Sequence, residues 1–271
     1  MQKIEIIKDP SKNFHFTNAL FDFDGTISLI REGWQQVMIP YFCEILEDTP
    51  IKEDKAKTEK IVTEFVDRLT GKQTIFQCMA LCDEVARRGG KPETPKYYKD
   101  EYLRRLMEKI HDRREGLRAG TINKDDLCVT GAREFLTLLK NRGVKMFVAS
   151  GTDEPQVKEE VELLGFTEFF DGGIYGAKDA AVDCSKELVI KELLESDNFN
   201  GNELVAFGDG YVEIELANNA GGYGVAVATD EKHPGNLDEH KRQKLLRAGA
   251  GMCIADFSEP EKIIAAFGNA L

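Results

Sequence analysis

The sequence has 271 residues, of which 42% are hydrophobic, and a net charge of −12 at pH 7. An acidic chain repels phosphate backbones, so we expect no nucleic-acid partner. The sequence has no apolar run of about 18 residues, so we expect no membrane span. Six cysteines without Cys-x-x-Cys spacing and four scattered histidines predict neither a disulfide framework nor a zinc site. The first ten residues lack the apolar segment of a signal peptide, so we expect a cytoplasmic protein.

The first part of the chain begins like a sheet and then becomes helical. Residues 4–7 are predicted to form a short strand, and the apolar run 19–21 a buried strand that ends at Asp22. From about residue 31 to residue 125 the spacing is helical, with apolar positions three and four apart in 34–46, 61–69 and 102–110. We therefore expect an all-helical domain over residues 31–125.

The rest of the chain alternates helices and strands. Helices are predicted near 132–141, 155–164, 186–195 and 212–218, and strands at 145–149, 204–207, 225–228 and 252–255. This alternation predicts right-handed crossovers and a parallel sheet with helices on both faces. We therefore expect an α/β core of residues 1–30 and 126–271. Because the helical insert follows the first buried strand directly, we expect it to lie over the strand ends and to close on a substrate.

Carboxylates follow two of the predicted strands, in Asp22-Phe-Asp-Gly-Thr26 and in Gly208-Asp-Gly-Tyr-Val-Glu213. Ligands bind at the carboxyl ends of strands in open parallel sheets, which favours a catalytic role over one in solvation. Asp22 could attack a phosphoryl group and form an aspartyl-phosphate. Asp24 points the same way two residues later, so it could serve as general acid and then as general base.

Asp209 and Glu213 add two more carboxylates at a neighbouring strand end. With Asp22 they would form an all-oxygen environment suited to Mg²⁺, which would offset the repulsion between a carboxylate and an anionic phosphate. The alternative is that Asp209 caps the following helix and that Glu213 stabilises its first turn.

Ser150 and Gly151 follow the strand predicted at 145–149. The Ser150 hydroxyl and nearby backbone N–H groups could hold phosphate oxygens at a helix start. A helix cap by Thr152 or Asp153 is the alternative for those two residues, but it does not explain Ser150.

Lys186 stands at the start of a predicted helix, where a cation is unfavourable unless an anion lies nearby. It is therefore a candidate for binding phosphate. Lys178, in a glycine-rich stretch, is the alternative lysine.

Together these stretches resemble the haloacid dehalogenase superfamily, phosphatase branch. Asp22-Phe-Asp-Gly-Thr26 matches its first motif, Ser150 its second, Lys186 its third, and Asp209 with Glu213 its fourth. The resemblance implies a Rossmann-like core with a helical cap inserted between the first two motifs. It also implies an aspartyl-phosphate intermediate and Mg²⁺ held by Asp22, the backbone carbonyl of Asp24 and Asp209. Glu213 departs from the pattern, since the family more often has aspartate there.

The resemblance leaves the reaction open. Asp24 argues against a dehalogenase, and we favour a phosphatase of a small phosphorylated metabolite, such as a sugar phosphate or a phosphoglycolate-like compound. A sugar-phosphate mutase, a phosphonate hydrolase with a Schiff-base lysine, and a non-catalytic protein that keeps the fold are the alternatives. In the insert, Arg31 and Lys72 could contact the leaving group, although most such residues are simply surface side chains.

Overall fold

The computed structural model describes residues 3–10, 14, 16–178, 186–187, 190–191, 195 and 201–268. Its contacts divide the chain into two compact units, Met1–Glu32 with Arg113–Leu271, and Gly33–Asp112. The predicted α/β fold with an inserted helical part is confirmed, but the predicted limits of the insert, 31 and 125, are too wide. Residues 113–125 belong with the sheet because Arg113 donates hydrogen bonds to the carbonyl oxygens of Ile30 and Glu32, while Arg118 pairs with Glu159.

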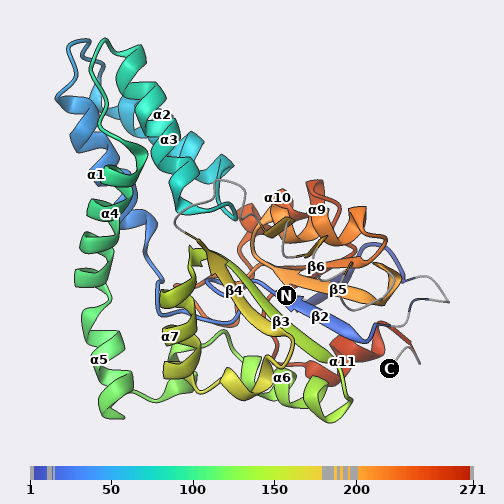
Figure 1. The fold of residues 1–271 in the computed structure, drawn as a ribbon. Coiled ribbons are helices and arrows are strands. Elements are labelled where there is room, and N and C mark those ends of the chain that lie inside the picture. The colour runs from blue at the N-terminus through green and yellow to red at the C-terminus, as the bar shows by residue number, and fades with distance from the viewer. Residues whose placement is uncertain are drawn as a thin grey trace. The chain divides into compact units, whose positions relative to one another are not determined.

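The first unit is built on a seven-stranded sheet with the order β1-β7-β6-β5-β2-β3-β4 (Figure 1). β1 pairs antiparallel with β7, and all other neighbouring strands are parallel. The strands are β1 Ile4–Ile6, β2 Asn18–Phe21, β3 Lys145–Asp153, β4 Gly173–Ala177, β5 Leu204–Gly208, β6 Tyr223–Val227 and β7 Met252–Ile254. All predicted strands are present; β4 was not predicted, because its two glycines hide the apolar pattern.

The central three strands bring the motif-bearing loops together. Phe21 of β2 is level with Val148 of β3 on one side and with Phe207 of β5 on the other. Because all three strands run in the same direction, the residues that follow them emerge at one edge of the sheet. The stretches that begin at Asp22, Ser150 and Asp209 therefore share that edge.

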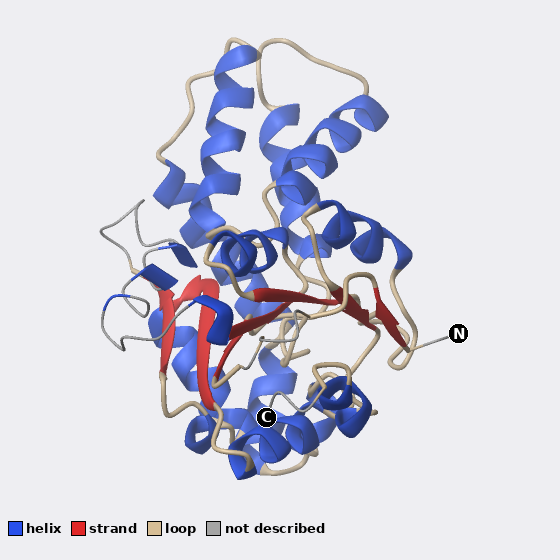
Figure 2. Cartoon of the chain, turned by 90° about the vertical axis from the view of Figure 1, so that its right-hand side faces the viewer, coloured by secondary structure: helices blue, strands red, loops and turns tan. Residues whose placement is uncertain are grey.

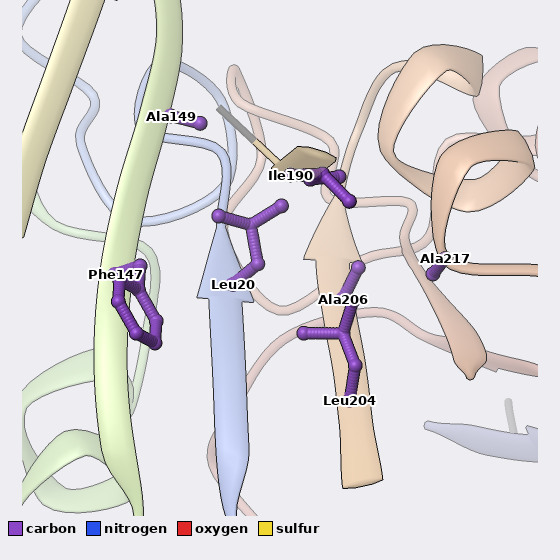
Figure 3. Close-up of a cluster of buried hydrophobic side chains, with 7 residues drawn as sticks. All are labelled: Leu20, Phe147, Ala149, Ile190, Leu204, Ala206 and Ala217. Carbon is purple, nitrogen blue, oxygen red and sulfur yellow. The ribbon is translucent and has the colours of Figure 1, made fainter. Parts of the chain in front are cut away.

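Helices cover both faces of this sheet (Figure 2). On one face Leu20 and Ala206 lie in a buried cluster with Ala217 of α9 (Tyr211–Asn219) (Figure 3). On the other face Phe21 and Phe207 stack on each other and contact Phe135 of α6 (Ala132–Asn141). Burial on both faces explains the continuous apolar runs of the strands. The helices of this unit are α5 His111–Ala119, α6 Ala132–Asn141, α7 Glu154–Leu164, α9 Tyr211–Asn219, α10 Glu239–Arg247 and α11 Pro260–Ala265.

The helix predicted at 186–195 is confirmed at its described residues, which are all helical. The remainder of that helix lies outside the described residues. α10 and α11 were not predicted, because α10 has one buried side chain, Leu245, and α11 has only 6 residues.

The second unit consists of four helices, α1 Gln35–Glu47, α2 Lys55–Arg68, α3 Thr74–Arg87 and α4 Pro95–Lys109. Local signals start two of them: Asp54 accepts hydrogen bonds from the first turn of α2, and Thr94 caps α4, which begins with proline. Buried apolar side chains form its interior, among them Phe42, Val62, Leu81 and Leu106. Within the described part of the chain, no helix is long and apolar enough to cross a membrane.

Candidate active site

Asp22 is the buried carboxylate directly after β2, and its side chain is only 7% exposed. Oδ1 accepts a hydrogen bond of 2.8 Å from the Phe23 backbone N–H, and Oδ2 lies 2.9 Å from Nζ of Lys186. Burial raises the pKa of Asp22 to about 6; Lys186 opposes this rise, while the charges of Asp209 and Asp24 add to it. Asp22 therefore interacts electrostatically with Lys186, Asp209 and Asp24, which come from the third, fourth and first motifs.

Asp24 contacts the end of β3, and its two carboxylate oxygens differ in their hydrogen bonds. Oδ2 accepts a hydrogen bond of 2.8 Å from the Thr152 hydroxyl and a longer one of 3.4 Å from Ser150. Oδ1 is buried and has no hydrogen-bond partner among the described residues. The Nε atom of Arg31 is 3.7 Å from Oδ1, which is too far for a hydrogen bond.

The loop that carries both aspartates needs a glycine at its turn. Gly25 has φ of +76°, in the left-handed region, and a Cβ atom there would lie 2.4 Å from Oδ2 of Asp209. The loop is fastened to the end of β5 by Thr26, whose hydroxyl oxygen accepts a 3.0 Å hydrogen bond from the Asp209 backbone N–H. The first and fourth motifs are thus in direct contact.

Lys186 joins the third motif to this group. Its side chain is 5% exposed and its Nζ forms ion pairs with Asp22 and with Oε1 of the fully buried Glu213. Lys178, the alternative lysine, is exposed and lies near Glu154 instead. The structure therefore brings Lys186, and not Lys178, to Asp22.

Asp209 does not cap the following helix, because the N-cap of α9 is Gly210 and no side chain bonds there. Its Oδ2 instead lies 2.8 Å from Nζ of Lys241, which also contacts Oε1 of Glu231 at 2.6 Å. Burial and the nearby Asp209 carboxylate raise the pKa of Glu231. Burial alone would lower the pKa of Lys241, but the two carboxylates raise it above its usual value.

Sequence reasoning missed Lys241 and Glu231. Glu231 lies in the loop after β6, the strand predicted at 225–228, and Lys241 lies in the first turns of α10, which was not predicted. The stretch around Glu231 reads as an ordinary polar surface loop. The one signal that could have found Lys241 is its position three residues after Asp238, the N-cap of α10, where a cation is unfavourable without an anion.

Ser150 and Gly151 lie within β3, which continues to Asp153 past an irregular pairing with β4. Ser150 is buried, its Oγ accepts a 3.0 Å hydrogen bond from the Thr152 backbone N–H, and Gly151 is partly exposed. Asp153 is the N-cap of α7 but makes no side-chain cap hydrogen bond. Asp153 therefore occupies the cap position without a side-chain cap hydrogen bond, and the Thr152 hydroxyl bonds to Asp24 instead of capping the helix.

The two residues expected to read the leaving group lie in different units. Arg31 belongs to the sheet-containing unit, where its guanidinium bonds to both carboxylate oxygens of Glu160 and to Oε1 of Gln156. Lys72 lies in the helical unit, with Nζ 5.7 Å from the centre of the Phe76 ring. Arg31 is 6% exposed and Glu160 fully buried, so this ion pair is part of the core.

The residues present fit a magnesium ion, although within the described chain no three Asp, Glu, His or Cys side chains group as metal ligands. Two carboxylates, Asp22 and Asp209, interact closely enough for the charge of one to raise the pKa of the other. A cation between them would relieve this repulsion, and the Asp24 carbonyl can supply a third oxygen. Oxygen ligands with several retained waters are what Mg²⁺ prefers.

A scan against protein families matches residues 17–221 to the haloacid dehalogenase-like hydrolases. The chain belongs to this family. The match covers all four motif stretches, from Asp22 to Glu213. A comparison with curated proteins found no match.

Solved structures share the fold along nearly the whole chain. A haloacid dehalogenase-like protein from Agrobacterium tumefaciens is 18% identical with a TM-score of 0.61, covering 94% of this chain and 100% of that one. A protein described as a predicted phosphoglycolate phosphatase from Haemophilus somnus is 16% identical, with a TM-score of 0.59 and coverages of 92% and 98%. A β-phosphoglucomutase from Clostridium difficile is 18% identical, with a TM-score of 0.57 and coverages of 93% and 97%.

Proposed function

We propose that this hydrolase is a Mg²⁺-dependent phosphatase of a small phosphorylated metabolite, with Asp22 as nucleophile and Asp24 as general acid and base. One observation carries the proposal: Asp22 is ion-paired with Lys186 and lies within electrostatic reach of Asp24 and Asp209. The proposed nucleophile Asp22 and the proposed proton donor Asp24 thus lie close to the positive charge of Lys186. Membership of the hydrolase family supports the same reaction class.

In the first step a carboxylate oxygen of Asp22 attacks phosphorus and the bond from phosphorus to the leaving oxygen breaks. Asp24 gives its proton to that oxygen, so the substrate leaves as a neutral alcohol. In the second step Asp24 takes a proton from water, whose oxygen attacks phosphorus of the aspartyl-phosphate. Phosphate departs, and the Asp22 carboxylate and protonated Asp24 are restored.

The remaining residues have roles in holding charge. Ser150 and the Gly151 N–H would bind phosphate oxygens, and Lys186 would neutralise them while Glu213 holds it in position. Asp22, the Asp24 carbonyl and Asp209 would bind Mg²⁺, with Glu213 paired to Lys186 and therefore outside that set. When bound, the metal supplies positive charge that lets an anionic nucleophile approach an anionic phosphate.

The proposed substrate is small, and the inserted helical unit is proposed to carry a residue that selects it, Lys72. The fold shared with the protein described as a phosphoglycolate phosphatase supports this class by analogy. The five described cysteines, Cys43, Cys78, Cys82, Cys128 and Cys253, are free thiols, in keeping with a proposed cytoplasmic location.

The experiment is phosphate release from a panel of small phosphorylated metabolites, with and without Mg²⁺, for the wild type and Asp22→Asn. We expect release to require Mg²⁺ and to fall at least about a thousandfold in the variant, because no nucleophile is left. Asp126→Asn, which alters an exposed carboxylate, is the matched control and should leave release unchanged.

Each other outcome contradicts a part of the proposal. Equal release by Asp22→Asn would exclude Asp22 as nucleophile. Isomerised sugar phosphate without free phosphate would show a mutase, which shares both aspartates. No turnover of any compound would contradict the phosphatase.

A further inference from the structure

The carboxylate of Asp24 is held at one oxygen only. Oδ2 accepts the Thr152 hydroxyl at 2.8 Å and Ser150 at 3.4 Å, whereas Oδ1 is buried without a hydrogen-bond partner among the described residues. A buried acceptor without a partner is destabilising, so this atom is suited to accept a hydrogen from a ligand.

Among the described residues, Arg31 is the cation near Oδ1 of Asp24, but it does not hydrogen-bond to this oxygen. Arg31 lies 3.7 Å away through Nε, but the same Nε bonds to both oxygens of Glu160, at 3.2 and 2.9 Å. Its Nη2 bonds to Glu160 and to Gln156. The guanidinium is therefore directed at α7, and Oδ1 stays open.

The Thr152 hydroxyl contacts Asp24 and does not cap the helix that follows it. α7 begins after Asp153, and the hydroxyl of Thr152 points back across 128 residues to Asp24. An oxygen that already accepts two hydroxyl hydrogens is a poorer proton acceptor than one that accepts none. The two oxygens of Asp24 are thus chemically distinct before substrate arrives.

The geometry points to Thr152 as the positioning residue of the general acid: it fixes Oδ2, so that the proton is carried and delivered by Oδ1. This inference rests on the proposed phosphatase function. During attack by Asp22 on phosphorus, the O–H bond at Oδ1 breaks as the leaving oxygen gains that proton. Loss of the Thr152 hydroxyl lets the carboxyl group rotate, and proton delivery fails more often.

The test compares leaving groups. An aliphatic alcohol must be protonated as it leaves, whereas nitrophenolate leaves without a proton. The parameter is kcat/KM, because it ends at formation of the aspartyl-phosphate and is independent of its hydrolysis. The probes are the best alkyl phosphate of the metabolite panel and p-nitrophenyl phosphate, each with the Mg²⁺-loaded wild type, Thr152→Val and Thr152→Ser.

For Thr152→Val we expect a fall of about 10- to 100-fold with the alkyl phosphate, since general acid catalysis is worth about 100-fold or more. With p-nitrophenyl phosphate the fall should stay within about threefold. Thr152→Ser, which keeps the hydroxyl, should restore the alkyl rate, and Thr137→Val, at an exposed threonine bonded to the Arg133 carbonyl, should change neither.

Equal losses with both substrates, or no loss with either, would overturn the role of Thr152 while leaving the phosphatase intact. A wild type that releases no phosphate from any compound would instead overturn the proposed function. The ratio of the two rates is taken from one preparation, so it does not depend on what fraction of the variant folds.

Discussion

Asp22 bears its charge where burial opposes it. The pKa of its carboxyl is raised to about 6, chiefly by desolvation, against about 3.8 for an unperturbed aspartate. A raised pKa in the folded protein means that folding favours the protonated form. The stability that this provides is complete below pH 3.8 and is lost as the pH rises through 6.

We therefore expect Asp22→Asn to be more stable than the metal-free wild type at pH 7.5, by about 3 kcal/mol for a shift of this size. The advantage should shrink steadily as the pH falls from 6 toward 4. Urea unfolding of both proteins across this range measures the difference.

Asp126→Asn, at an exposed position, is the control and should show no such pH dependence. A constant difference between wild type and Asp22→Asn at every pH would contradict the raised pKa of Asp22.

The same scale shows what the sequence could predict of the site. Asp22, Ser150 and Asp209 follow apolar runs that form parallel strands, so the sheet alone brings these three residues to one edge. Glu231 lies in a loop and Lys241 at the start of a helix, and both follow β5 in the chain. Their meeting at Asp209 depends on tertiary packing, which no local pattern contains.

At the scale of elements, one buried ion pair ties the loop after β2 to α7. Arg31 is 6% exposed and Glu160 fully buried, and the pair is made through several hydrogen bonds. Burial raises the pKa of Glu160 despite the attraction of Arg31. Removing one partner of such a pair leaves a buried charge poorly compensated.

We expect Glu160→Ala to destabilise the protein by about 3 kcal/mol in urea unfolding. The double variant Arg31→Leu with Glu160→Leu should recover much of that loss, since it removes both charges. Asp100→Ala breaks an exposed pair with Lys96 in α4 and should cost no more than about 0.5 kcal/mol. A Glu160→Ala variant as stable as Asp100→Ala would show that the buried pair contributes nothing.

The elements themselves were largely predictable because most of them bury one face. α1, α2, α4, α6, α7 and α9 carry apolar residues at helical spacing, and the central strands are buried on both sides. β4 was missed because Gly173 and Gly176 interrupt it, and α10 because it has only one buried side chain, Leu245. A weak apolar pattern gives little basis for prediction.

At the scale of the whole molecule, the two units have separate interiors and the chain passes between them twice, after Glu32 and after Asp112. We therefore expect them to open independently in native-state hydrogen exchange. Leu81→Ala, at a fully buried site in α3, should speed exchange in α1–α4 and leave β2, β3 and β5 unchanged.

The matched control is Leu139→Ala, at a fully buried site in α6, which should have the converse effect. Faster exchange in both units from either variant would show that the molecule unfolds as one cooperative body.

Arg113 joins the two segments through which the chain enters and leaves the helical unit. Its guanidinium donates to the carbonyl oxygens of Ile30 and Glu32, so the segment that returns from the helices is fastened to the segment that leaves for them. A change of length within residues 33–112 therefore leaves the points where the chain enters and leaves the helical unit tied together, because both sides of this contact lie outside that range.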